Sequence, residues 1–174
     1  MHPDWMSQVQ GVKCVPGGKE RWESSVHAID WLMQNAKCKM QNCNVLIHDA
    51  ARPFVSRRII EDVCRALETH EAVTVAVPAT DTMYSLTPDP SPEGEGRIIK
   101  DIPDRSTMMR AQTPQAFRLS LIKQAYDLAM QDPNLQATDD CGIVHRYLPA
   151  TPIFIVEGDE QNRKITYKED IKTA

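Results

Sequence analysis

The sequence predicts an α/β fold, in which a mostly parallel sheet is flanked by helices and an antiparallel β-arm protrudes from it. Continuous apolar runs of strand length occur at 44–47, 72–78 and 152–159, as expected of strands buried on both faces of a sheet. Amphipathic stretches of helical period lie between these runs. A Pro/Gly-rich segment at 87–96 stands between two short apolar runs and predicts the arm.

The composition is that of one folded globular domain. The chain has 174 residues, of which 41% are hydrophobic and 25% charged, so we expect a single domain over 1–174 with a substantial core. The net charge of -4 argues against a nucleic-acid partner, and an anionic ligand must therefore meet local clusters of Arg and Lys. No run of 18 apolar residues and no signal-peptide pattern occurs, which predicts a cytoplasmic protein with no membrane partner.

The cysteines predict neither a disulfide framework nor a zinc site. They are odd in number, scattered, and include no CxxC pair. Because several fall in apolar runs, we expect reduced cysteines that lie mostly in the core: Cys14, Cys38, Cys43, Cys64 and Cys141.

The organising stretch of the chain is 44–53. Its apolar run ends in Asp49, followed by two alanines, Arg52 and Pro53. This pattern predicts a buried strand that delivers a carboxylate and a guanidinium to its carboxyl end, where open α/β sheets bind ligands. Ser56 is a suitable N-cap for a helix over 57–68. The simpler interpretation is that Asp49 and Arg52 only pair with each other.

The stretch before it predicts a short strand at 12–15, a turn at 16–21 and a helix at 22–36. The Gly17-Gly18 pair allows backbone N–H groups to face a ligand, although a plain turn fits equally well.

The stretch after it predicts a βαβ unit, because strand 44–47, helix 57–68 and strand 72–78 follow one another closely. We therefore expect these strands to form a parallel pair. Further helices are predicted at 119–130, at 140–147 and from Lys168 onward. Thr138 can cap the second of these, and capping alone would also explain the acids Asp139 and Asp140.

Residues 79–113 predict a dimerisation arm with strands at 82–86 and 97–102. An isolated hairpin is marginal in water, so the arm needs a surface to pack on, and a second subunit is the obvious candidate. The alternative is an arm that folds back on its own domain. The apolar residues that require cover are Met83, Tyr84, Leu86, Ile98, Ile99 and Ile102.

Seven short motifs agree on one family. They occur in the family's order and extend over essentially the whole chain: 16–21 with Ser24, 48–53, Asp81-Thr82, Asp104-Arg105, 112–115, 138–140 and 162–166. Together they resemble the 2-C-methyl-D-erythritol 4-phosphate cytidylyltransferase family, which includes the closely similar ribitol-5-phosphate cytidylyltransferase.

The resemblance implies a Rossmann-like nucleotide-diphospho-sugar transferase fold and a homodimer. It also implies that CMP is transferred from CTP to a polyol phosphate, with magnesium as cofactor and pyrophosphate as product. The substrate phosphate attacks the α-phosphorus directly, so positioning and charge neutralisation supply the catalysis.

The resemblance also implies the roles of individual residues. Asp49 would ligate magnesium, with Asp159 or Glu160 open as a second ligand. Arg105 and Lys164 would hold the attacking phosphate, although each alone could be a solvated surface charge. The CTP site would further comprise Gly18, Lys19, Ser24, Ala50 and Arg52, and the polyol phosphate would also contact Thr82, Thr113 and Thr138.

The sequence departs from the family at its start, where the family's first strand and Gly-rich loop would precede Met1. We therefore expect the chain as it stands to bind CTP weakly and to turn over little substrate. Ribitol phosphate is the alternative substrate. A binding or dimerisation module without catalysis is the alternative of another class.

Overall fold

A computed structural model of the chain describes residues 11–35, 43–87 and 98–173. These residues divide into two compact units, one built from the chain up to Cys43 with Arg118–Ala150, the other from Asn44–Phe117 with the chain from Thr151 on. The elements of the first unit are α1 (Arg21–Asn35), α3 (Leu119–Ala129) and α4 (Asp140–Tyr147). Those of the second are β1 (Asn44–Ile47), α2 (Arg57–Ala66), β2 (Ala72–Pro78), β3 (Ser85–Leu86), β4 (Ile99–Asp101), η3 (Arg105–Thr107), β5 (Met109–Arg118), β6 (Ile153–Glu157) and η4 (Lys168–Thr173).

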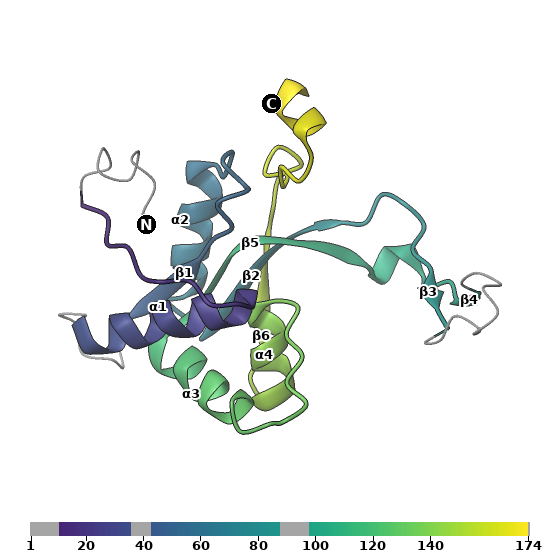
Figure 1. Cartoon of the computed structure of the whole chain (residues 1–174). Coiled ribbons are helices and arrows are strands. Elements are labelled where there is room, and N and C mark those ends of the chain that lie inside the picture. The colour runs from purple at the N-terminus through teal and green to yellow at the C-terminus, as the bar shows by residue number, and fades with distance from the viewer. Residues whose placement is uncertain (1–10, 36–42, 88–97, 174) are drawn as a thin grey trace. The chain divides into compact units, whose positions relative to one another are not determined.

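The second unit contains a four-stranded sheet in the order β1-β5-β2-β6 (Figure 1). β2 and β6 pair in parallel, whereas β2 and β5 pair antiparallel. The expectation that the strands at 44–47 and 72–78 pair directly was therefore wrong, because β5 lies between β1 and β2. The α/β class itself is confirmed, and within the second unit α2 packs on a mixed sheet.

β5 was not predicted from the sequence. Pro114 lies in its middle, and proline is normally confined to edge strands and bulges. The register explains the exception: Val73 faces Ala116 while Val75 faces Gln112, so residues 113–115 form an irregularity in the ladder. A residue without an N–H group is tolerated there because no ladder hydrogen bond is required of it.

α2 closes one side of this unit. Ser56 caps it by accepting the N–H of Ile59, as expected. Ile59, Val63 and Leu67 are fully buried against Val73, Val75, Ala116 and Val156 of the sheet. Each such aliphatic side chain contributes about 1.5–3 kcal/mol on leaving water, so this stripe fixes the helix on the sheet.

Several local expectations need correction. Residues 12–15 form no strand, and the segment from Lys168 is a 3-10 helix. β1 is an edge strand of the described sheet, so its apolar residues are half-buried rather than fully buried. Asp139 rather than Thr138 caps α4, because its carboxylate accepts the Gly142 N–H at 2.7 Å.

The cysteines also differ from the expectation of a reduced core set. Cys141 is buried and is not disulfide-bonded, but Cys64 is exposed because it faces away from the stripe that α2 buries. Cys14 is exposed because residues 12–15 are not part of a sheet, and the buried Cys43 is disulfide-bonded. Among the residues described, no helix is long and apolar enough to cross a membrane.

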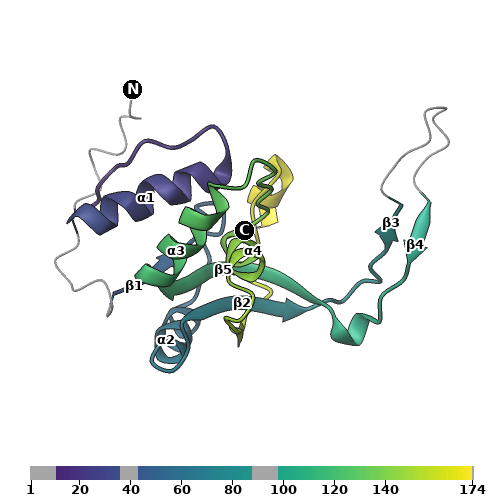
Figure 2. The same cartoon turned by 90° about the horizontal axis from the view of Figure 1, so that it is seen from below.

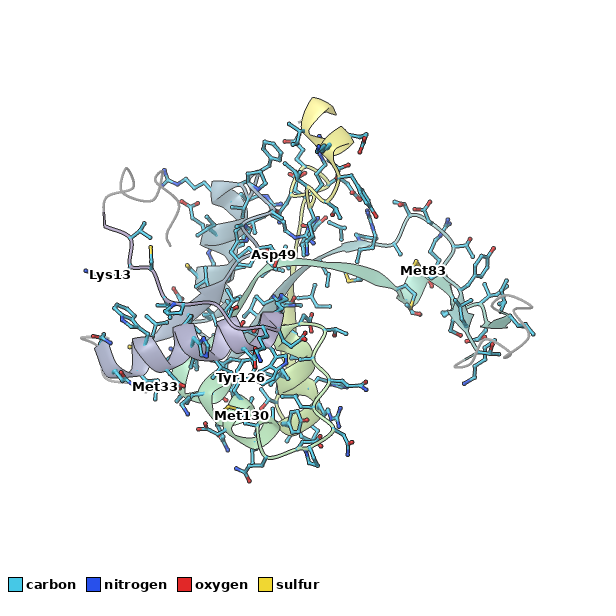
Figure 3. The ribbon with its side chains drawn as sticks, in the orientation of Figure 1. Lys13, Met33, Asp49, Met83, Tyr126 and Met130 are labelled. Carbon is cyan, nitrogen blue, oxygen red and sulfur yellow. The ribbon has the colours of Figure 1, made fainter. Side chains whose placement is uncertain are left out.

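The predicted arm begins after β2, and β3 and β4 form its antiparallel two-stranded sheet (Figure 2). Its last residues, from Met109, already belong to β5. The six apolar residues named above for the arm are between 39% and 65% exposed. Met83 marks this segment in Figure 3. The structure thus shows two antiparallel strands with exposed apolar side chains, but both strands are shorter than the predicted 82–86 and 97–102. Of the tip predicted at 87–96, residues 88–96 lie outside the described residues.

The first unit is a packed set of helices, where Ile29 of α1, Ile122 of α3 and Ile143 of α4 are almost fully buried. A polar cluster lies inside it. Tyr126 donates its hydroxyl to Oδ1 of Asp140 at 2.6 Å, and Arg21 pairs with Oδ2 of Asp140 at 2.9 Å. This cluster ties the beginnings of α1 and α4 to α3.

Candidate functional site

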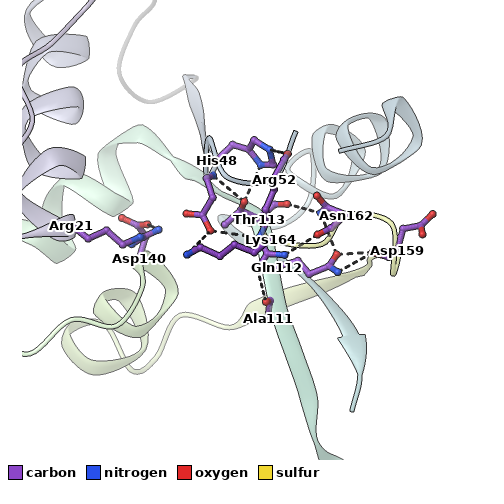
Figure 4. Close-up of polar contacts among 11 residues, drawn as sticks. Arg21, His48, Arg52, Ala111, Gln112, Thr113, Asp140, Asp159, Asn162 and Lys164 are labelled. Atoms are coloured by element: carbon purple, nitrogen blue, oxygen red, sulfur yellow. Dashed lines mark hydrogen bonds and ion pairs between the residues drawn. The ribbon is translucent and has the colours of Figure 1, made fainter. Parts of the chain in front are cut away.

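The loop after β1 is held by a hydrogen-bonded clamp (Figure 4). The Thr113 hydroxyl accepts the backbone N–H of Asp49 at 3.0 Å and lies 2.9 Å from Nδ1 of His48. Nε2 of His48 lies 2.9 Å from the carbonyl oxygen of Arg52. Since a carbonyl only accepts, Nε2 carries the proton and Nδ1 accepts from Thr113. The imidazole therefore links β5 to the end of the loop that carries both charges.

Asn162 fixes the same loop from the other side. It is fully buried, and its Nδ2 donates to the Thr113 carbonyl at 2.8 Å and to Oε1 of Gln112 at 3.2 Å. Its own carbonyl accepts from Nη1 of Arg52 at 2.8 Å. The Ile165 N–H donates to the Ala51 carbonyl at 2.8 Å. Residues 162–165 and 49–52 are thus joined at both ends.

Gln112 and Gly158 complete this support. Nε2 of Gln112 donates to the Asp159 carbonyl at 2.8 Å. A Cβ atom at position 158 would lie 2.5 Å from Oε1 of Gln112, so only glycine permits this approach. Asn162 and Gln112 belong to the motifs at 162–166 and 112–115, but no role was predicted for either, because a buried amide has no periodicity that distinguishes it from a surface one.

Three charges meet at the end of β1. Oδ2 of Asp49 lies 3.5 Å from Nε of Arg52 and 3.5 Å from Nζ of Lys164. The Asp49 and Arg52 side chains are only 17% and 12% exposed, whereas Lys164 is 50% exposed. Nε of Arg52 is buried and has no hydrogen-bond acceptor. The pairing of Asp49 with Arg52 is therefore real, but it is one part of a larger cationic arrangement.

A pocket of about 340 Å³ adjoins these charges. Four cations line it, namely Arg52, Arg110, Arg163 and Lys164, against one carboxylate, that of Glu160. Val77, Ala111 and Gln112 form the rest of its lining, beside the carboxyl end of β2. In a chain of net charge -4, such a concentration of positive charge creates a local site for an anion.

Three residues predicted for the CTP site, Gly18, Lys19 and Ser24, lie in the first unit. The Gly18 N–H donates to Oγ of Ser24 at 3.0 Å, and the N–H groups of Lys19 and Glu20 donate to Oε2 of Glu23. These bonds lower the pKa of Glu23, chiefly through the Glu20 N–H. A Cβ at position 18 would lie 2.1 Å from that of Glu23, so the turn requires glycine. Thr138 is exposed one residue before the cap of α4.

The remaining predicted residues lie on the arm of the second unit. Arg105 begins η3, is exposed, and donates to the Thr80 carbonyl at 3.0 Å. Thr82 is exposed before β3. Neither lines the pocket that Lys164 lines. Within this chain the structure thus brings together Asp49, Arg52, Thr113 and Lys164, with Ala50 in the same turn, but does not bring Arg105 to them.

The donor set allows a magnesium site of limited protein ligation. The described residues contain no group of three His, Cys, Asp or Glu side chains able to hold a metal. Asp159 uses Oδ1 to accept the Gln161 N–H, and Glu160 pairs with Arg110. Asp49 is left as a single carboxylate, which fits an ion that draws its other ligands from water and phosphate.

The fold is a Rossmann-like nucleotide-diphospho-sugar transferase fold. Its charged pocket lies beside the carboxyl end of β2 and the amino end of the antiparallel β5. A sequence model of the family "2-C-methyl-D-erythritol 4-phosphate cytidylyltransferase" matches residues 3–174. The chain belongs to this family, as the motifs had indicated.

Individual relatives agree. The chain is 45% identical over 163 residues to 2-C-methyl-D-erythritol 4-phosphate cytidylyltransferase of Thermobifida fusca, covering 93% of this chain and 62% of that protein. It is 39% identical over 158 residues to a bifunctional ribulose 5-phosphate reductase/CDP-ribitol pyrophosphorylase of Haemophilus influenzae, covering 91% and 31%. Among solved structures, 4-diphosphocytidyl-2C-methyl-D-erythritol synthase of Anaerococcus prevotii superposes with a TM-score of 0.80 at 27% identity, covering 98% and 69%. The chain thus spans about three fifths of the length of its Thermobifida relative.

Proposed function

We propose that the chain acts as a cytidylyltransferase that moves CMP from CTP to 2-C-methyl-D-erythritol 4-phosphate and releases pyrophosphate, a reaction that supplies isoprenoid precursors. The observation that carries this proposal is the pocket in which four cations face one carboxylate, beside the triad of Asp49, Arg52 and Lys164. A phosphate ester is the ligand chemistry that such a pocket favours.

In the proposed reaction, an oxygen of the substrate phosphate forms a bond to the α-phosphorus of CTP while the bond to the β-phosphate oxygen breaks. The chain contributes orientation and charge rather than a nucleophile. Lys164 offers a point charge to the attacking phosphate, and Arg52, held by Asn162, offers a fixed guanidinium. The clamp through His48 and Thr113 keeps the two positions constant.

Magnesium is part of this proposal. Asp49 would hold it, and the ion would neutralise charge on the phosphates when bound. The pairs of Asp49 with Arg52 and Lys164 are 3.5 Å long, too long for hydrogen bonds, so the carboxylate is not locked by either cation.

The proposal includes a cytoplasmic homodimer formed through the arm. The uncovered apolar residues of β3 and β4 need a partner surface. Arg105 and Thr82 would then complete the pocket of the partner subunit, which accounts for their separation from Lys164 within one chain.

The test is pyrophosphate release from CTP in the presence of each polyol phosphate, methylerythritol phosphate or ribitol phosphate. It is run on this chain and on the chain with a family-like N-terminal strand and Gly-rich loop added. Faster pyrophosphate release with methylerythritol phosphate than with ribitol phosphate, and loss of this activity in Lys164→Ala, support the proposal. Inactivity with both substrates contradicts it.

Ribitol phosphate is the second candidate substrate because of the named activity of the Haemophilus relative. Both substrates present a phosphate and hydroxyl groups to the same cations, so the side-by-side comparison decides between them. A non-catalytic binding module is distinguished by a thermal shift with CTP and magnesium in the absence of turnover.

A further inference from the structure

The pocket contains a charge pair whose arginine has no predicted role and whose carboxylate was predicted only as an alternative metal ligand. Arg110 of β5 pairs with Glu160 of the loop after β6, through Nη2 and Oε1. The two side chains are 43% and 63% exposed. Both line the pocket, and Glu160 is its one carboxylate.

The position of Arg110 is fixed by the sheet. It pairs in register with Val77, which is 4% exposed. The carbonyl oxygen of the next residue, Ala111, accepts a hydrogen bond from Nη2 of Arg52 at 3.4 Å. The backbone of Arg110 is therefore anchored beside Arg52, while its guanidinium lies at the solvent side, where Glu160 is its partner.

The position of Glu160 is fixed equally. The turn that carries it is closed by the Asn162 N–H, which donates to the Asp159 carbonyl at 2.9 Å, and by the Gln161 N–H on Oδ1 of Asp159. Exposed pairs of this kind contribute little stability, because water screens the charges and two long side chains must be held in one geometry. The pair can therefore exchange partners at low cost.

We infer that Arg110 and Arg163 form a further phosphoryl-binding subsite of this pocket, and that Glu160 is an internal competitor which the bound anion displaces from Arg110. A phosphoryl group offers the guanidinium up to three acceptor oxygens, where the carboxylate offers two. Displacement also places Glu160 next to the incoming anion, so the carboxylate weakens binding by like-charge repulsion. The subsite rests on the proposed function only in that its ligand is phosphorylated.

This arrangement predicts opposite effects for the two halves of one ion pair. Glu160→Gln removes the competitor and tightens pyrophosphate binding about fivefold, since one like charge is removed at close range in a screened site. Arg110→Gln weakens it about fivefold, because a charge-assisted hydrogen bond is lost. The gain from Glu160→Gln becomes smaller in the Arg110→Gln background, because there is no guanidinium left to release.

A matched control exists in the same unit. Arg57 and Glu61 form an exposed pair at 2.6 Å on α2, and neither lines the pocket. Glu61→Gln changes the net charge as Glu160→Gln does, so it reports the effect of overall charge alone. We expect pyrophosphate affinity to be unchanged in this variant.

The experiment is calorimetric titration of the chain and its variants with pyrophosphate, and separately with inorganic phosphate and methylerythritol phosphate, at constant ionic strength. Tightening by Glu160→Gln, absent in Glu61→Gln and reduced beside Arg110→Gln, supports the subsite. The ligand that shows the largest difference identifies the source of the phosphoryl group.

Three outcomes overturn the inference: no pyrophosphate binding by the wild-type chain, weaker or unchanged binding by Glu160→Gln, or an equal gain with and without Arg110. Because binding is measured without turnover, these outcomes differ from a failure of the proposed function. That failure would appear as normal anion binding without CMP transfer.

Discussion

Asn162 donates its side-chain N–H to the carbonyl of Thr113 at 2.8 Å, and so joins the loop that carries Lys164 to the strand that supports Asp49. Asn162→Asp replaces this donor by a buried acceptor. We expect a loss of about 2–4 kcal/mol in the free energy of unfolding, because buried polar groups are left unpaired. Denaturant unfolding measures this loss, and Asn134→Asp, an exposed control, should stay close to the wild type. A similar cost in both variants would contradict the role of Asn162.

Thr113 is expected to act through its hydroxyl on the loop rather than through its methyl group. Thr113→Val keeps the shape but leaves the Asp49 N–H and Nδ1 of His48 without their partner. We predict that Thr113→Val weakens pyrophosphate binding about tenfold, which corresponds to ~1.4 kcal/mol, because the loop no longer holds its charges in place. Thr113→Ser keeps the hydroxyl and should retain most of the affinity. Equal affinities of the two variants would show that the clamp does not position the charges.

The turn at 17–20 should respond to acid through Glu23. Its carboxylate accepts hydrogen bonds from two backbone N–H groups. The pKa of Glu23 lies below the usual value of 4.5, and the hydrogen bond from the Glu20 N–H is the largest cause. A group with a lowered pKa in the folded state stabilises the fold above its unfolded pKa, and this contribution is lost as the pH falls through the folded pKa. The amide proton shifts of Lys19 and Glu20 should therefore titrate with a midpoint below 4.5. Glu23→Gln should abolish the transition, and a midpoint at or above 4.5 would refute the capping role.

Loss of the buried Tyr126 hydroxyl should lower the stability of the fold more than loss of the hydroxyl of Tyr147, whose partner is partly exposed. Burial raises the pKa of Tyr126, as does the neighbouring Asp140, so its hydroxyl remains a donor. Tyr126→Phe should cost about 1–2 kcal/mol, or ~2–4 °C in Tm per kcal/mol for a chain of this size. Tyr147→Phe is the matched control, because its hydroxyl donates to the partly exposed Asp132 at 2.7 Å. There water can replace the lost bond.

The pH dependence of this pair has a definite sign. A tyrosine with a raised pKa contributes stability that is present below its unfolded pKa of 10.0 and is lost as the pH rises beyond that value. Thermal unfolding between pH 8 and about 11 should therefore show a steeper alkaline loss in the wild type than in Tyr126→Phe. Parallel curves would mean that the hydroxyl ionises as easily in the folded state as in the unfolded state.

The parts of the fold that were predictable are those with a local signal. The helix at 57–66 follows from a capping serine and an apolar stripe, and the strands at 72–78 and 153–157 follow from uninterrupted apolar runs. β5 was not predictable, because its strand character comes from two neighbouring strands and its sequence carries a proline and two buried glutamines.

The site shows the same division. Asp49 and Arg52 were predictable because the strand before them ends abruptly, and Lys164 because of its motif. His48, Gln112 and Asn162 act through hydrogen bonds between segments more than 45 residues apart, which no local pattern encodes. Arg110 and Arg163 are ordinary surface charges in sequence, and the resemblance names Glu160 only as an alternative metal ligand. Their place in one pocket follows from the fold alone.

The final prediction concerns the origin of Arg105 in the proposed dimer. If each pocket takes Lys164 from one subunit and Arg105 from its partner, a dimer of one Lys164→Ala chain and one Arg105→Ala chain contains one intact pocket. Mixing the two inactive variants under conditions that exchange subunits should then restore about a quarter of the wild-type turnover, because half of the randomly formed dimers are mixed and each of these has one good site.

The control is Ile98→Asp, which places a charge on an arm residue that is 65% exposed and should prevent subunit pairing. Light scattering should give the monomer mass for this variant, and adding the substitution to both chains of the mixture should abolish the recovery. If Arg105 and Lys164 instead serve the same subunit's pocket, every pocket in the mixture carries one defect. Turnover would then stay at the level of the separate variants, and the arm would have to be assigned to the support of its own chain.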